Sequence, residues 1–138
     1  MQFYWFISNE SFMMSFFKKS FISIGGKLME GYVMHQVNIS DQLHQAAVAY
    51  SYDHDTALYH VHNLALNWFI DIQKDPGQDY LPYLASISSL KKRSMWISKE
   101  TLKRAKELAA LDGVPVTRIV YAALFYFFEA VNQKTLAF

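Results

Sequence analysis

The chain has 138 residues, 52% of them apolar and 18% charged, with five glycines, three prolines and no cysteine. This length excludes two large independent domains, and the composition is unlike that of disordered chains. The lack of cysteine excludes disulfides, thiolate zinc sites and cysteine catalysis, and a formal net charge of +1 argues against a uniformly basic nucleic-acid binder.

The charge is nevertheless distributed unevenly along the chain. Residues 29–90 hold seven acidic side chains and one lysine, for a sum of −6. Residues 91–138 hold nine basic and four acidic side chains, for a sum of +5, and positions 1–28 add the remaining +2. The near-neutral total therefore conceals an acidic first part and a basic second part.

Residues 1–28 form a doubtful N-terminal extension. Glu10 and the pair Lys18-Lys19 divide its aromatic sequence into runs too short to span a bilayer, and the order of a secretory signal is absent. Gly25-Gly26 can be encoded by a purine-rich ribosome-binding sequence placed before Met29. We hypothesise that residues 1–28 are a translated leader and that Met29 is the true start; an ordered arm or an interfacial anchor are the alternatives. We expect a cytoplasmic protein without a membrane partner.

An internal repeat becomes visible when the chain is shifted against itself so that position 37 falls on position 95. The segment Val37–Ser40 then falls on Met95–Ser98 without a gap. Each copy opens with an alternating run, Met34–Ile39 in the first and Lys92–Ile97 in the second, which is typical of a short strand. We therefore expect the same order of elements twice.

A helix is predicted directly after each strand. Ser40 and Ser98 stand where a side-chain oxygen can cap the first free amides, and the acids Asp41 and Glu100 that follow suit the positive end of a helix. In the second copy, the apolar residues near helical spacing are Leu102, Ala105, Leu108, Ala109 and Leu111. Gly113 is expected to end this helix, since glycine tolerates the left-handed conformation of a C-cap.

A second helix closes each copy, over about residues 57–73 and 115–132. Thr56 is the expected N-cap of the former, and Pro115 suits the first turn of the latter. These two segments are the most apolar of the chain and are the predicted shared core. The aromatic run Phe125–Phe128 covers more of a helix than one packed face needs, so either partial exposure or deep burial fits it.

Neither a lone short strand nor two short helices are stable alone, but two copies in one chain can pair. The predicted ribbon is antiparallel, and four side chains are expected to face the helices: Val37, Ile39, Met95 and Ile97. Six side chains are expected to face outward: Met34, Gln36, Asn38, Lys92, Ser94 and Trp96.

This pattern resembles the ribbon-helix-helix superfamily of DNA-binding regulators, most clearly in Lys91–Glu100 (KKRSMWISKE), the helix to Gly113 and the helix after Pro115. The arrangement is similar to the tandem, single-chain form of conjugative-plasmid accessory proteins of the TraY type. The implied fold is mostly α with a short two-stranded antiparallel β-ribbon, made of two units that form an intramolecular pseudo-dimer. The units are residues 32–74 and 91–133, joined by a connector over 75–90 and followed by a tail over 134–138.

The resemblance implies that the ribbon enters the major groove of double-stranded DNA and that its six outward residues contact bases. It also implies phosphate contacts at the ribbon end and at the start of each second helix. The residues expected there are Thr56, Ala57, Lys91, Arg93, Val116, Thr117 and Arg118. The superfamily usually has a small or polar residue where this chain has Trp96, which leaves stacking on DNA or an inward turn as its alternatives.

The expected function is transcriptional regulation by sequence-specific DNA binding. A relaxosome accessory protein for plasmid transfer is the first alternative, and an antitoxin-like protein-interaction module is the second. Further partners to expect are a second copy side by side on DNA, RNA polymerase or a relaxase. No phosphate loop or catalytic arrangement is present, and His60 and His62 point about 200° apart on a helix. We therefore expect no enzyme activity, no cofactor and no metal.

Overall fold

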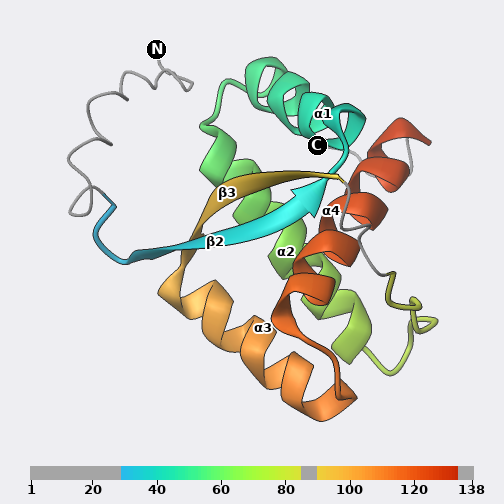
Figure 1. Cartoon of the computed structure of the whole chain (residues 1–138). Helices are drawn as coiled ribbons and strands as arrows, with labels where there is room; N and C mark the ends of the chain where they lie inside the picture. Colours follow the sequence, from blue (N-terminus) through green and yellow to red (C-terminus); the bar gives the residue numbers. More distant parts are fainter. Residues whose placement is uncertain (1–28, 85–89, 134–138) are drawn as a thin grey trace.

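The computed structural model describes residues 29–84 and 90–133. The proposed leader over 1–28, the tail over 134–138 and residues 85–89 of the connector lie outside the described residues. In chain order the elements are β2 (Tyr32–Ile39), α1 (Asp41–Asp53), α2 (Leu58–Lys74), β3 (Lys91–Ser98), α3 (Lys99–Asp112) and α4 (Val116–Asn132). The described part of the chain is mostly helical and contains one two-stranded antiparallel sheet, as predicted (Figure 1).

The two strands form a ribbon that runs from the Tyr32–Ser98 pair to the Ile39–Lys91 pair. Both strands extend beyond the predicted alternation, β2 at its start and β3 at each end. The four residues expected to face the helices are at most 3% exposed, which confirms their orientation: Val37, Ile39, Met95 and Ile97. Figure 1 shows the ribbon lying across α2 and α4, with α1 and α3 on opposite sides of it.

Serine caps fix the start of α1 and of α3. The Ser40 hydroxyl accepts a hydrogen bond from the Leu43 amide at 3.0 Å, and the Ser98 hydroxyl accepts one from the Thr101 amide at 3.1 Å. Both serines have an extended backbone, so each strand passes into its helix without an intervening loop. The two predicted N-caps are confirmed, and they occupy corresponding positions of the two copies.

The end of α3 is fixed by Gly113, whose φ of 67° is left-handed and whose amide donates to the Ala109 carbonyl. This confirms the predicted C-cap. Leu111, which we expected in the buried stripe of α3, is 76% exposed. The reason is geometric: two positions beyond the buried Ala109 the helix has turned by about 200°, away from the core.

The core lies between the ribbon and the two closing helices, which begin at corresponding positions of the two copies, Leu58 and Val116. Five residues of α2 and the five at the corresponding positions of α4 are at most 3% exposed: Val61, Ala65, Leu66, Phe69 and Ile70, and Ile119, Ala123, Leu124, Phe127 and Phe128. In the aromatic run of α4, Phe127 and Phe128 are thus buried, whereas Phe125 and Tyr126 are half-buried. The run serves mainly as core.

The described part of the connector is fastened to both closing helices. The Gln73 side chain donates to the Leu81 carbonyl at 2.9 Å and accepts from the Leu81 amide at 2.8 Å. The Tyr126 hydroxyl donates to the Pro82 carbonyl at 2.7 Å. The chain leaving α2 is therefore held against α4 before it enters the second half.

Candidate nucleic-acid interface

The outward face of the ribbon brings together the six side chains expected to contact bases. They form three direct cross-strand pairs, Met34 with Trp96, Gln36 with Ser94, and Asn38 with Lys92. Gln36, Lys92 and Ser94 are exposed, Met34 is 48% exposed, and Asn38 and Trp96 are half-buried. Because paired residues of an antiparallel ribbon share a face, the row lies on the side away from the helices.

The chemistry of this row changes along the ribbon. Met34 and Trp96 form an apolar end, and Asn38 and Lys92 combine an amide with a positive charge at the other end. Between them, the Gln36 amide donates weakly to the Ser94 hydroxyl at 3.4 Å. Amide groups offer a donor and an acceptor side by side, which is the arrangement that pairs with the edge of adenine in the major groove.

Asn63 of α2 fixes the end of β3 to the helices, and this residue was not predicted as part of the site. Its carbonyl oxygen accepts from the Ser98 amide at 2.9 Å, and its amino group donates to the Trp96 carbonyl at 2.9 Å. One turn further on, Asn67 donates to the Thr101 hydroxyl at 3.0 Å. The i, i+4 spacing of these asparagines places them on one face of α2 and was the available signal.

Arg93 does not lie with the outward row. It has the strand parity of Met95 and Ile97, its side chain is 23% exposed, and its guanidinium donates to the Asp41 carboxylate at 2.8 Å. The expected phosphate contact at Arg93 would therefore compete with an ion pair inside the chain. Lys91, in contrast, is exposed at the start of β3 and leaves its charge available to a ligand.

The start of α2 differs from the prediction. Ala57 is the N-cap and makes no side-chain cap hydrogen bond, so the expected cap at Thr56 is wrong. The Thr56 amide donates to the Ser51 carbonyl at 2.9 Å and closes the end of α1 instead. A phosphate at this helix end would have to use the following amides, which point out of the first turn.

The start of α4 repeats this geometry, with Pro115 as an extended N-cap without a side-chain cap hydrogen bond. The Arg118 amide donates to the Pro115 carbonyl at 3.0 Å, so its backbone is engaged while its side chain is exposed. Thr117 is also exposed, and Val116 is half-buried. The amides of Val116 and Thr117 precede the first intrahelical donors and are the groups left for a phosphate.

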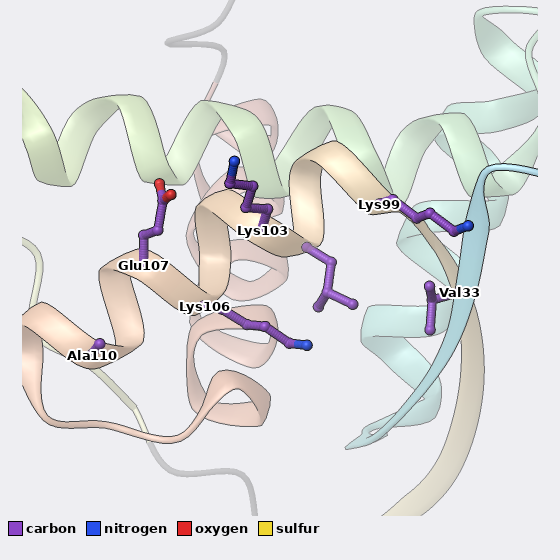
Figure 2. Close-up of a pocket in the computed structure, with 7 residues that line it drawn as sticks. Val33, Lys99, Lys103, Lys106, Glu107 and Ala110 are labelled. Carbon is purple, nitrogen blue, oxygen red and sulfur yellow. The ribbon is translucent and has the colours of Figure 1, made fainter.

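A shallow groove of about 620 Å³ runs beside β2 along α3 (Figure 2). Its lining combines apolar side chains with three lysines and one acid: Val33, Leu102, Ala110, Lys99, Lys103, Lys106 and Glu107. These lysines were not among the residues expected to contact DNA, because nothing in the local sequence indicates that this face of α3 adjoins a strand from the other half of the chain.

Two histidines of the first half are neutral by environment. His62 on α2 is 6% exposed, and burial, followed by the charge of His44, lowers its pKa to about 3. His44 on α1 is half-buried, and burial, followed by the positive charge of Arg93, lowers its pKa to about 4. Within residues 29–84 and 90–133, no three metal-ligating side chains lie close enough to hold a metal ion.

Comparisons with known proteins found no match: no protein-family model matches the chain, and the searches of curated proteins and of solved structures found no similar protein. In the described residues, no single helix has both the length and the apolar character needed to cross a membrane. The helices α3 and α4 pass that test only as a pair, bent by 107°.

Proposed function

We propose that this chain is a tandem ribbon-helix-helix protein that binds double-stranded DNA in a sequence-specific way and regulates transcription. The observation that carries the proposal is the register of the ribbon, which sets six outward side chains in three cross-strand pairs on one solvent-facing surface. A two-stranded ribbon fits the major groove, which is about 12 Å wide.

The pseudo-dimer arrangement is part of this proposal. Its support is the recurrence of strand, helix and helix at one constant offset, with N-caps at Ser40 and Ser98 and with second helices that start at Leu58 and Val116. Two such units in one chain present one ribbon and two helix starts to the same ligand.

The outward residues of β2 differ from those at the corresponding positions of β3. This difference determines whether the expected DNA site is symmetric. A dimer of identical chains presents the same residues on both strands and suits an inverted repeat. Here Met34, Gln36 and Asn38 on β2 correspond to Lys92, Ser94 and Trp96 on β3, so the expected site is not palindromic.

Removal of the two outward amides tests the assignment. The double variant Gln36→Ala/Asn38→Ala should lose about 1–3 kcal/mol of discrimination per lost base contact, measured against a duplex enriched by wild-type protein from a random library. The matched control is Gln42→Ala/Gln45→Ala, which removes two exposed amides from α1. Equal discrimination by both double variants and the wild type would refute the assignment.

The biological process is a separate question, and the relaxosome role is the alternative within DNA binding. Mapping of bound sites in the native host distinguishes the two. Footprints at promoters with altered transcript levels support regulation, whereas a footprint near a transfer origin with altered nicking supports the relaxosome role.

A protein-interaction module is the second candidate, favoured by the acidity of the first half. Residues 29–84 carry seven acids and one lysine, and Asp41, Asp53 and Asp55 are exposed around α1. Such a surface repels phosphate. Duplex affinity measured against salt concentration separates the candidates, because phosphate neutralisation makes the affinity fall steeply with salt.

A further inference from the structure

The lysine-lined groove beside β2 lies next to the free edge of the ribbon. The Lys99 amide donates to the Gly31 carbonyl at 3.0 Å, which ties the first residue of α3 to the residue that precedes β2. Further along α3, the charge of Lys106 acts on His35 of β2, where it adds to burial in lowering the pKa of that imidazole. Lys99 and Lys106 therefore both flank β2.

Figure 2 shows how the charges are distributed in this groove. The side chains of Lys99 and Lys106 extend toward β2 and Val33, whereas Lys103 and Glu107 extend from α3 in another direction. Both flanking lysines are exposed, and among the described residues neither belongs to a salt bridge. Two uncompensated positive charges thus lie along one edge of the ribbon.

The other edge of the ribbon lacks this feature. In the first copy, the positions that correspond to Lys99 and Lys106 are Asp41 and Val48 on α1. Asp41 accepts from Arg93 at 2.8 Å, so an acid and an internal ion pair occupy the place of the first lysine. The two flanks of the ribbon therefore differ in charge, although their backbones correspond.

We propose that Lys99 and Lys106 bind the DNA sugar-phosphate backbone along the β2 edge and hold the ribbon in one orientation on its site. This inference rests on the proposed function. Strands in a ribbon are about 4.8 Å apart, so a ribbon in a groove about 12 Å wide has a phosphate wall beyond each edge. The lysines of α3 meet the wall on the β2 side, whereas on the α1 side the helix carries Asp41 and the exposed cation is Lys91 at the start of β3.

The salt dependence of duplex binding tests this contact. Each neutralised phosphate contributes about 0.9 to the slope of log affinity against log salt, so Lys99→Gln/Lys106→Gln should reduce the slope by about 1.8. Between 50 and 200 mM salt, the wild-type affinity should therefore fall about 12-fold more than that of the variant. Lys99→Arg/Lys106→Arg should keep the wild-type slope because it keeps the charge.

The matched control is Lys74→Gln/Lys103→Gln, which changes the net charge equally but removes an exposed lysine of α2 and the groove lysine whose side chain extends away from β2. Its slope should stay close to that of the wild type. Ethylation interference gives the orientation of the ribbon on DNA. Some phosphates should weaken binding of the wild type when ethylated but leave binding of Lys99→Gln/Lys106→Gln unchanged. We expect these phosphates to lie on one wall of the groove only.

The outcomes separate this inference from the proposed function. If the wild type binds DNA and Gln36→Ala/Asn38→Ala loses discrimination, but both lysine double variants give the same slope, the backbone contact is refuted and the base-reading ribbon stands. If Lys99→Gln/Lys106→Gln instead abolishes self-association in sedimentation with an unchanged slope, the groove is a protein interface and the inference is wrong. If the wild type binds no duplex, both proposals fail.

Discussion

The buried histidine of α2 makes the folded state sensitive to acid. His62 is 6% exposed, neither ring nitrogen has a hydrogen-bond partner within the described residues, and the corresponding position of α4 is the buried Val120. Burial, followed by the charge of His44, lowers its pKa from 6.5 to about 3. The unfolded chain therefore binds a proton below pH 6.5 that the folded chain excludes.

The sign of the effect follows from this difference. The contribution of His62 to stability is complete above pH 6.5 and is lost as the pH falls from 6.5 toward 3. At about 1.36 kcal/mol per pH unit, the loss at pH 4.5 is about 2.7 kcal/mol. The variant His62→Val copies the valine of α4 and removes both the titrating ring and its two unpaired nitrogens.

The assay is urea unfolding followed by circular dichroism at pH 7.5 and 4.5. The wild type should lose about 2.7 kcal/mol more stability over this interval than His62→Val, because His44 titrates in both proteins and contributes to both losses. The control is His60→Val, which replaces an exposed histidine of the same helix and should retain the wild-type loss. Equal losses in the wild type and His62→Val would refute the reasoning.

Three further changes probe how the elements are fixed, and urea unfolding checks each. Gly113→Ala should cost about 1 kcal/mol, because a φ of 67° disfavours a side chain although no atom lies within 4 Å of the added Cβ; no loss would exclude the left-handed cap. Asn63→Ala leaves the Ser98 amide and the Trp96 carbonyl unpaired and should lower the free energy of unfolding by about 2 kcal/mol, with faster hydrogen exchange at the Ser98 amide. Unchanged exchange would contradict the hydrogen bonds of Asn63 to β3. Ser40→Ala should cost about 1 kcal/mol and Ser40→Asp much less, since aspartate also caps; equal losses would exclude capping.

The features that the sequence predicted well are those determined by neighbours along the chain. The caps at Ser40, Ser98 and Gly113 depend on residues within one turn, and the inward and outward faces of the strands follow from alternation alone. The alternating strand pattern and the capping serine occur at the same offset in both copies. The prediction of these elements in one copy therefore supports their prediction in the other. The expected cap at Thr56 is wrong because α2 begins one residue later, after Ala57, while the Thr56 amide pairs with the end of α1.

The features that the sequence did not predict depend on pairs of residues far apart in the chain. The run of basic residues Lys91-Lys92-Arg93 predicts a phosphate contact for Arg93, but its partner Asp41 lies 52 positions away. Asn63 contacts the strand 33 and 35 positions later. Nothing in the local pattern distinguishes such contacts from solvated polar residues, since they exist only after the ribbon has formed over the helices.

The two halves of the chain agree where they are buried and differ where they are exposed. The core positions of α2 and α4 correspond in register, because both must pack against the same ribbon and against each other. The outward strand residues and the outer faces of α1 and α3 carry no such constraint, and there Asn38 corresponds to Trp96 and Asp41 to Lys99. In a dimer of identical chains, a substitution in one chain is also present in the other. The two flanks of the ribbon must then carry the same charges, so one flank cannot have lysines where the other has an acid. Joining the halves in one chain removes that restriction: β2 and β3 pair within the molecule, and each flank is free to acquire its own charge while the shared core is kept.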